Sequence, residues 1–138
     1  MKIKLLILHF LIVGNIFSQN TISFFKDLKG SYNFETIKTA DFNRYENTIS
    51  DGFNKAIYWF KIPNLNTNKE YVFRILNPHI HNIKAFQNSV ELNPLLNERY
   101  TTIPFISDNE VFIRIEPRKE SYLPVEIIEE RAFLLQEK

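Results

Sequence analysis

The sequence predicts an all-β domain, built as an antiparallel sandwich or a jelly roll. Short runs alternate apolar and polar residues, and turn residues separate them every eight to fifteen residues or so. The intervals between these runs lack the helical periodicity that a parallel βαβ fold requires. Aromatic residues make up 14% of the chain and glycine occurs only three times. This composition favours a packed core over disorder.

The first eighteen residues predict a secretory signal peptide. Lys2 and Lys4 form a short positive start, the apolar run 5–13 follows, and Ser18 is a small residue before the expected cleavage site. A membrane-spanning helix needs about 20 apolar residues, and this run is roughly half as long. We therefore expect export to the periplasm or the cell exterior, with residues 19–138 forming one β-sandwich domain.

Charge and cysteine content exclude several kinds of partner. Loss of Lys2 and Lys4 from the 17 basic residues leaves 15 against 16 acidic ones, which gives a near-neutral exported domain. Such a balance provides no electrostatic attraction for nucleic acid. The chain has no cysteine, so it has no disulfide, thiolate metal site or lipid-modified cysteine. No second apolar run is long enough to span a membrane after cleavage.

The region before residue 55 has weak patterns. Residues 20–25 predict a short edge strand, and residues 34–45 predict a turn of helix or irregular structure. Asp51 and Gly52 form a turn signal that ends this region.

The pattern then changes to strands bounded by turns. Asn88 and Ser89 predict a tight turn, and residues 93–105 predict a longer connection with room for one short strand. Pro124 lacks a backbone N–H, which predicts an edge position or a bulge. Residues 131–135 predict a last strand or the start of a linker. The strands predicted from Ala56 onward cover residues 56–62, 70–77, 82–87, 90–92, 110–116 and 122–129.

The sequence contains no motif for catalysis. Its isolated glycines form no phosphate-binding loop, and no serine lies in a G-x-S-x-G setting. His79 and His81 have the spacing of two metal ligands on one strand face, but they follow Pro78 in a loop and predict a solvated pair. Glutamates that could pair for acid–base chemistry also fit turns and polar strand faces: Glu116, Glu120, Glu126, Glu129 and Glu130. We expect no enzyme, no metal and no cofactor.

Side-chain alternation suggests one candidate binding face. Tyr58, Phe60 and Ile62 are predicted to face the interior, so Trp59 and Lys61 point the other way. If three strands are neighbours, that opposite face is aromatic and basic and could bind a sugar ring or a small anion. The alternative is an ordinary outer face whose basic side chains pair with Glu116 or Glu126. The candidate ligand-binding residues are Trp59, Lys61, Arg74, Phe112 and Arg114.

The order of motifs resembles a known exported module. An aromatic-Trp strand followed by lysine, "YWFKI", precedes the asparagine-rich loop "PNLNTN" and the segment "YVFRILNPHIHNIKAF". Near the end comes "VFIRIEPRKESYLPVEII", with an Arg-containing strand and a Leu-Pro strand. Over residues 25–133 the chain resembles the type 2 extracellular domain of bacterial seven-transmembrane receptors with diverse intracellular signalling modules.

The resemblance implies a jelly-roll β-sandwich similar to carbohydrate-binding modules. It also implies a non-catalytic domain that senses a carbohydrate-like ligand and passes the signal to a downstream transmembrane module. The output of such receptors is a histidine kinase, a cyclase or a DNA-binding regulator. The chain as given reaches Lys138 before any such module, so we expect a receptor fragment or a stand-alone copy. A free carbohydrate-binding module and a dimerising interaction domain are the alternatives.

Overall fold

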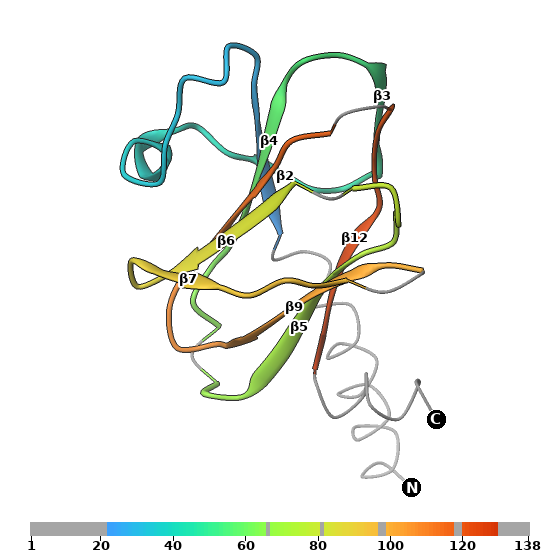
Figure 1. Cartoon of the computed structure of the whole chain (residues 1–138). Helices are drawn as coiled ribbons and strands as arrows, with labels where there is room; N and C mark the ends of the chain where they lie inside the picture. Colours follow the sequence, from blue (N-terminus) through green and yellow to red (C-terminus); the bar gives the residue numbers. More distant parts are fainter. Residues whose placement is uncertain (1–21, 66, 81, 97–98, 118–119, 130–138) are drawn as a thin grey trace, which may run out of the picture.

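The computed structural model shows an all-β protein with antiparallel sheets, which confirms the predicted fold class (Figure 1). It describes residues 22–65, 67–80, 82–96, 99–117 and 120–129. The predicted signal peptide and the segment 131–135 lie outside the described residues.

The strands form two main sheets and a two-stranded ribbon. The large sheet has the order β2 (Asn43–Arg44), β1 (Ser23–Asp27), β4 (Ile57–Ile62), β10 (Val111–Ile115), β6 (Ile83–Gln87) and β7 (Val90–Leu92). The small sheet has the order β12 (Val125–Glu129), β5 (Glu70–Ile75), β9 (Thr101–Ile106) and β8 (Leu95–Leu96). The ribbon pairs β3 (Ile49–Phe53) with β11 (Glu120–Leu123).

The main core lies between the two sheets. Tyr58, Phe60 and Ile62 of β4 are fully buried in it, as the alternation predicts. From the small sheet, Phe73 brings its ring centroid to 5.7 Å from that of Phe60. A core built from the inner faces of two antiparallel sheets defines a β-sandwich.

A second apolar cluster lies on the outer face of the large sheet. Residues 28–42, which we call the cover segment, cross this face and include the 3₁₀ helix η1 (Ile37–Thr39). The buried carboxylate of Asp27, at the end of β1, accepts hydrogen bonds from the amides of Ser31 and Tyr32 and so fixes the start of the segment. Because the cover segment buries apolar residues of its own, both faces of β4 are packed.

Two predicted elements differ from the structure: the turn predicted at Asp51 and Gly52, and the single strand predicted over residues 122–129. Asp51 and Gly52 do not end a region as a turn. They lie inside β3, where the register against β11 shifts and Gly52 has φ +66°. A glycine with positive φ is typical of a β-bulge. The predicted strand 122–129 is divided at Pro124 into β11 and β12, which pair with different strands. Pro124 itself lies between these two strands, and its carbonyl accepts a hydrogen bond from the amide of Leu76, so the predicted edge or bulge position inside a strand stays untested.

Two other strands also depart from the prediction. β9 runs for six residues in the middle of the small sheet, where the sequence predicted a connection with room for one short strand. Pro104 makes this strand hard to recognise in the sequence, because proline cannot donate a hydrogen bond to a neighbouring strand. β8 pairs only with Thr101 and Thr102 of β9, so the edge of β9 beside Pro104 is open and the missing N–H is tolerated. β1 is not an edge strand, because the short β2 pairs with its outer side at Ser23 and Phe24.

Candidate functional site

The face predicted to carry a ligand is covered in the structure. Trp59 is 1% exposed and Phe112 is 5% exposed, and both pack in the second cluster beneath the cover segment. The sequence left open whether this face is displayed, and the structure shows that its aromatic residues are not. The ligand role of Trp59 stays a prediction, and it requires the cover segment to move.

The basic residues of the predicted site each lie beside a glutamate. Lys61 pairs with Glu110 at 3.2 Å. Arg114 pairs with Glu116, and Arg74 pairs with Glu126, which are the two acidic partners that the alternative interpretation named.

The strands of the predicted site are not all neighbours. β4 and β10 are adjacent, so Lys61 lies opposite Phe112 and Trp59 lies opposite Arg114. β5 belongs to the small sheet, where the guanidinium of Arg74 lies 5.2 Å from the ring centroid of Tyr100. The structure therefore separates Arg74 from the other four candidate residues.

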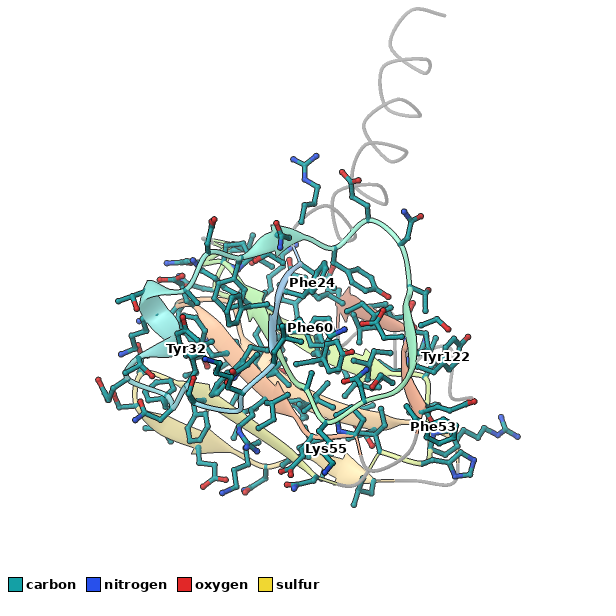
Figure 2. All side chains as sticks on the ribbon, turned by 90° about the horizontal axis from the view of Figure 1, so that it is seen from above. Phe24, Tyr32, Phe53, Lys55, Phe60 and Tyr122 are labelled. Atoms are coloured by element: carbon teal, nitrogen blue, oxygen red, sulfur yellow. The ribbon has the colours of Figure 1, made fainter. Side chains whose placement is uncertain are left out.

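The ribbon instead displays aromatic side chains to solvent. Phe53 is 77% exposed and Tyr122 is 46% exposed. Figure 2 shows both at one edge of the molecule, with Tyr32 of the cover segment on the far side. Exposed aromatic rings at the rim of a hollow are typical of a ligand site.

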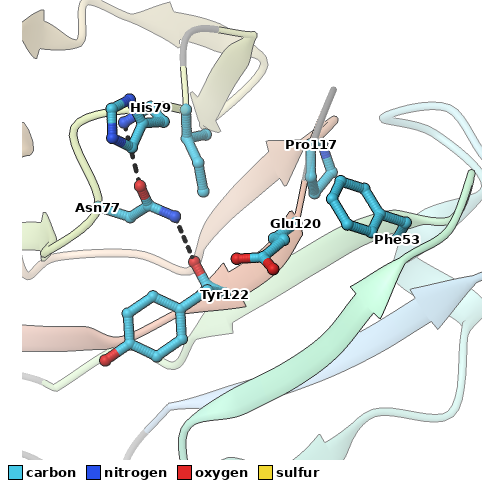
Figure 3. A pocket seen from close by; sticks show the side chains of 7 residues that line it. Phe53, Asn77, His79, Pro117, Glu120 and Tyr122 are labelled. Atoms are coloured by element: carbon cyan, nitrogen blue, oxygen red, sulfur yellow. Dashed lines mark hydrogen bonds between the residues drawn. The ribbon is translucent and has the colours of Figure 1, made fainter.

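The two rings border a hollow of about 300 Å³, which we call the ribbon hollow (Figure 3). The close view shows the carboxylate of Glu120 in its centre, with Phe53 and Pro117 on one side and His79 on the other. The residues that line it are Phe53, Asn77, His79, Ile80, Pro117, Glu120 and Tyr122.

Asn77 attaches the loop after β5 to the ribbon. Its side-chain amide donates a hydrogen bond to the carbonyl of Tyr122 at 2.7 Å, and its side-chain oxygen accepts one from the amide of His79 at 3.0 Å (Figure 3). Because Asn77 is buried, these bonds hold the two walls of the hollow at a fixed separation.

The bulge in β3 sets the direction of the exposed side chains. Phe53 pairs with Glu120, and Ser50 pairs with Tyr122, so one more residue lies on β3 than on β11 between these pairs. Glu120 and Tyr122 are exposed while Ser121 between them is buried, as strand alternation requires. Phe53, Glu120 and Tyr122 therefore share the outer face.

A polar network beneath the ribbon anchors it to the large sheet. The hydroxyl of Tyr58 donates to Asp51 at 2.7 Å, and the amine of Lys26 pairs with Asp51 at 3.1 Å. Asn54 donates to the hydroxyls of Tyr58 and Ser121. The hydrogen bond from Tyr58, with that from Lys26, lowers the pKa of Asp51, and the hydrogen bond to Asp51 raises the pKa of Lys26.

The hollow offers the chemistry needed for a hydroxylated ligand. The side chain of Glu120 has no ion-pair or hydrogen-bond partner among the described residues, and His79 is exposed. A carboxylate accepts hydrogen bonds, an imidazole donates or accepts them, and the exposed rings offer apolar faces. Within the described ranges, His, Asp and Glu form no group of three that could hold a metal; His81 lies outside them.

Sequence reasoning did not find this site. Phe53 follows the Asp-Gly pair that was interpreted as a turn, and Tyr122 was assigned only to a strand. The one local signal is the alternation in Glu120–Ser121–Tyr122, which does not show that the loop after β5 lies beside the ribbon.

The fold and the site define a class of protein, a β-sandwich domain with a solvent-facing hollow. The family model for 7TMR-DISM extracellular 2 matches residues 19–129. The chain belongs to this family of extracellular sensor domains of seven-transmembrane receptors, which confirms the resemblance in the sequence. No curated protein matches the chain. No helix within the described ranges is long and apolar enough to cross a membrane.

Proposed function

We propose that this chain is the exported, non-catalytic ligand-sensing domain of a bacterial transmembrane signalling receptor, and that it binds a carbohydrate in the ribbon hollow. The observation that carries the proposal is the exposure of Phe53 at the rim of a hollow that also contains the carboxylate of Glu120. Membership of a receptor sensor family supports the sensing role.

A sugar ring fits the two kinds of surface that the hollow presents. Its C–H face packs on an aromatic ring, which removes apolar area from water on both sides. Its hydroxyl groups donate to a carboxylate, and such charge-assisted hydrogen bonds are stronger than neutral ones. Phe53 provides the ring and Glu120 provides the acceptor, while His79 provides a second polar group.

A glycan array tests the ligand class. We expect the purified domain to retain a subset of neutral glycans, and we expect Phe53→Ala and Glu120→Gln to reduce that retention about tenfold or more. Leu28→Ala is the matched control, because Leu28 is 72% exposed and does not line the hollow. An array on which no glycan is retained would contradict the carbohydrate proposal, as would equal losses for Phe53→Ala and Leu28→Ala.

A separate experiment tests the receptor role. The source DNA beyond the codon for Lys138 should continue in frame into apolar segments of about 20 residues, each able to span a membrane. A stop codon followed by an unrelated gene would favour the free carbohydrate-binding module. The two experiments are independent, because a free module would still bind glycans through Phe53.

A further inference from the structure

A second hollow lies at the opposite end of the large sheet. It encloses about 430 Å³, and we call it the lysine hollow. β10 begins at the lysine hollow, near Glu110, and leads towards Pro117 of the ribbon hollow. The five residues of β10 span roughly 17 Å, and the two hollows share no lining residue, so the two sites do not overlap. The residues that line the lysine hollow are Phe34, Lys38, Lys61, Asn88, Ser89, Asn109, Glu110 and Phe112.

Segments far apart in the sequence form this hollow. η1 of the cover segment and the β6–β7 turn lie on the same side of the molecule in Figure 1. The rings of Phe34 and Phe86 join them, with centroids 4.7 Å apart. Asn33 fixes the turn that precedes η1, because its side-chain oxygen accepts hydrogen bonds from the amides of Glu35 and Thr36, both at 2.9 Å.

Aromatic rings hold both lysine side chains in place. The amine of Lys38 lies 4.6 Å from the ring centroid of Phe34, and the amine of Lys61 lies 5.6 Å from that of Phe42. These cation–π contacts restrict side chains that would otherwise sample many rotamers. The two lysine side chains therefore lose less conformational entropy when a ligand binds both amines.

The charges in the hollow do not cancel. Lys61 pairs with Glu110 at 3.2 Å, whereas Lys38 has no carboxylate within ion-pair distance among the described residues. Two amines and one carboxylate leave one net positive charge. Such a site attracts an anion of low charge, because Glu110 repels added negative charge.

The far wall of the hollow is a rigid polar turn. Asn88 and Ser89 have φ values of 53° and 62°, as in the two-residue hairpin turn that follows the twist of its strands. The side-chain amide of Asn109 donates a hydrogen bond to the side-chain oxygen of Asn88, which joins this turn to the turn before β10. The hydroxyl of Ser89 and the amides add hydrogen-bonding groups to the two charged amines.

We propose that the lysine hollow is a second binding site, and that it takes the carboxylate or sulfate group of a small ligand. Lys38 and Lys61 bind the oxyanion, and the wall of Asn88 and Ser89 donates or accepts hydrogen bonds around it. Lys61 and Phe112 are two of the residues that the sequence singled out for a sugar ring or a small anion, and this proposal assigns them to the anion. The oxyanion belongs either to an acidic sugar or to a free inorganic anion.

The single tryptophan provides a readout for this site. Trp59 packs in the same cluster as Phe112, and Phe112 lines the hollow. The N–H of the Trp59 indole is buried and has no hydrogen-bond partner within the described residues, so its emission depends on the packing around it. Binding at the lysine hollow is expected to shift Trp59 fluorescence, with little effect from a ligand in the ribbon hollow.

Titration of the domain with three probes tests the proposal. We expect D-glucuronate to shift Trp59 fluorescence at millimolar concentration and D-glucose to bind about tenfold more weakly, because glucose lacks the carboxylate. Sodium sulfate distinguishes the two sources of the oxyanion: competition by sulfate at equal concentration indicates a free anion, and weaker competition indicates an acidic sugar. Equal binding of glucuronate and glucose, or no response to either glucuronate or sulfate, would overturn the proposal.

Charge variants locate the binding. Lys38→Gln should weaken glucuronate binding about tenfold, while Glu110→Gln should strengthen it by removing the repelling charge. Lys55→Gln is the control, because Lys55 is exposed and does not line the hollow. Equal losses of glucuronate affinity for Lys38→Gln and Lys55→Gln would overturn the proposed site. Trp59 fluorescence reports on the lysine hollow, whereas the neutral-glycan array reports on the ribbon hollow, so failure of this proposal is distinguishable from failure of the proposed function.

Discussion

The hydroxyl of Tyr45 donates a hydrogen bond to the carbonyl of Leu123, 78 residues further along the chain, at 3.1 Å. The same hydroxyl accepts a hydrogen bond from the amide of Val125, also at 3.1 Å. Tyr45 thus binds both neighbours of Pro124, at the point where the chain leaves the ribbon and enters the small sheet. One buried side chain satisfies the backbone on both sides of a residue that has no N–H of its own.

Tyr45→Phe should therefore destabilise the domain. The substitution keeps the ring, whose centroid lies 5.9 Å from that of Phe60, and removes only the hydroxyl partner of two buried backbone groups. We expect a loss of about 1–3 kcal/mol in the free energy of unfolding, measured by urea denaturation. Tyr32→Phe is the control, because Tyr32 lies on the cover segment near the surface. Equal effects of the two substitutions would contradict this role.

Alanine at the two glycines with positive φ should have unequal costs. A Cβ at Gly52 would meet no atom within 4 Å, so Gly52→Ala bears only the backbone strain of the bulge, about 1 kcal/mol. A Cβ at Gly30 would lie 3.1 Å from Cδ1 of Ile57, which adds crowding to the same strain. Thermal unfolding should show a larger loss of stability for Gly30→Ala than for Gly52→Ala. The reverse order would show that the bulge in β3 tolerates a side chain at Gly52 less well than its open surroundings suggest.

Asp51 should make stability depend on pH in the acid range. Its pKa in the folded state is lowered from 3.8, so its stabilising contribution is present above that value and is lost as pH falls through the folded pKa. Between about pH 4 and pH 2, the unfolding free energy of the wild type should fall more steeply than that of Asp51→Asn. The denaturation midpoints of both proteins across this range provide the measurement. Parallel curves would mean that Asp51 is not stabilised by Tyr58 and Lys26.

Tyr58→Phe should raise the pKa of Asp51 towards its ordinary value. The hydrogen bond from Tyr58 is the largest cause of the lowered pKa, and this substitution removes it without shortening the side chain. Carboxyl chemical shifts of Asp51, followed by NMR from neutral to acid pH, report the change directly. Lys26→Gln should produce a smaller rise, because the hydrogen bond from Lys26 is the second cause.

Strand alternation predicted the core of the sandwich, because a period of two depends only on neighbours in the sequence. Tyr58, Phe60 and Ile62 face the interior for this reason. The burial of Trp59 could not be predicted in the same way, since it depends on the cover segment. The apolar residues of that segment, such as Phe34 and Phe42, have no regular spacing, and their packing on Trp59 is a tertiary effect.

The candidate site was harder to predict because it depends on strand order. Alternation placed Arg74 on an outer face, but it does not indicate which sheet contains β5. The ribbon hollow needs a bulge at Gly52 and a loop fixed by Asn77, and the partners of both come from distant segments. Local patterns contain neither pairing, so Phe53 could not be recognised from its neighbours as a candidate ligand residue.

The most direct test of the account compares Trp59→Phe with Phe53→Ala in two assays. Urea denaturation gives the free energy of unfolding, and calorimetric titration gives the affinity for the glycan that the array retains most strongly. Trp59→Phe should lose about 1–3 kcal/mol of stability and keep its affinity, since Trp59 is buried. Phe53→Ala should change stability by no more than about 0.5 kcal/mol and lose affinity about tenfold. If Trp59→Phe instead lost affinity while Phe53→Ala kept it, the ligand site would lie beneath the cover segment and the account would be contradicted.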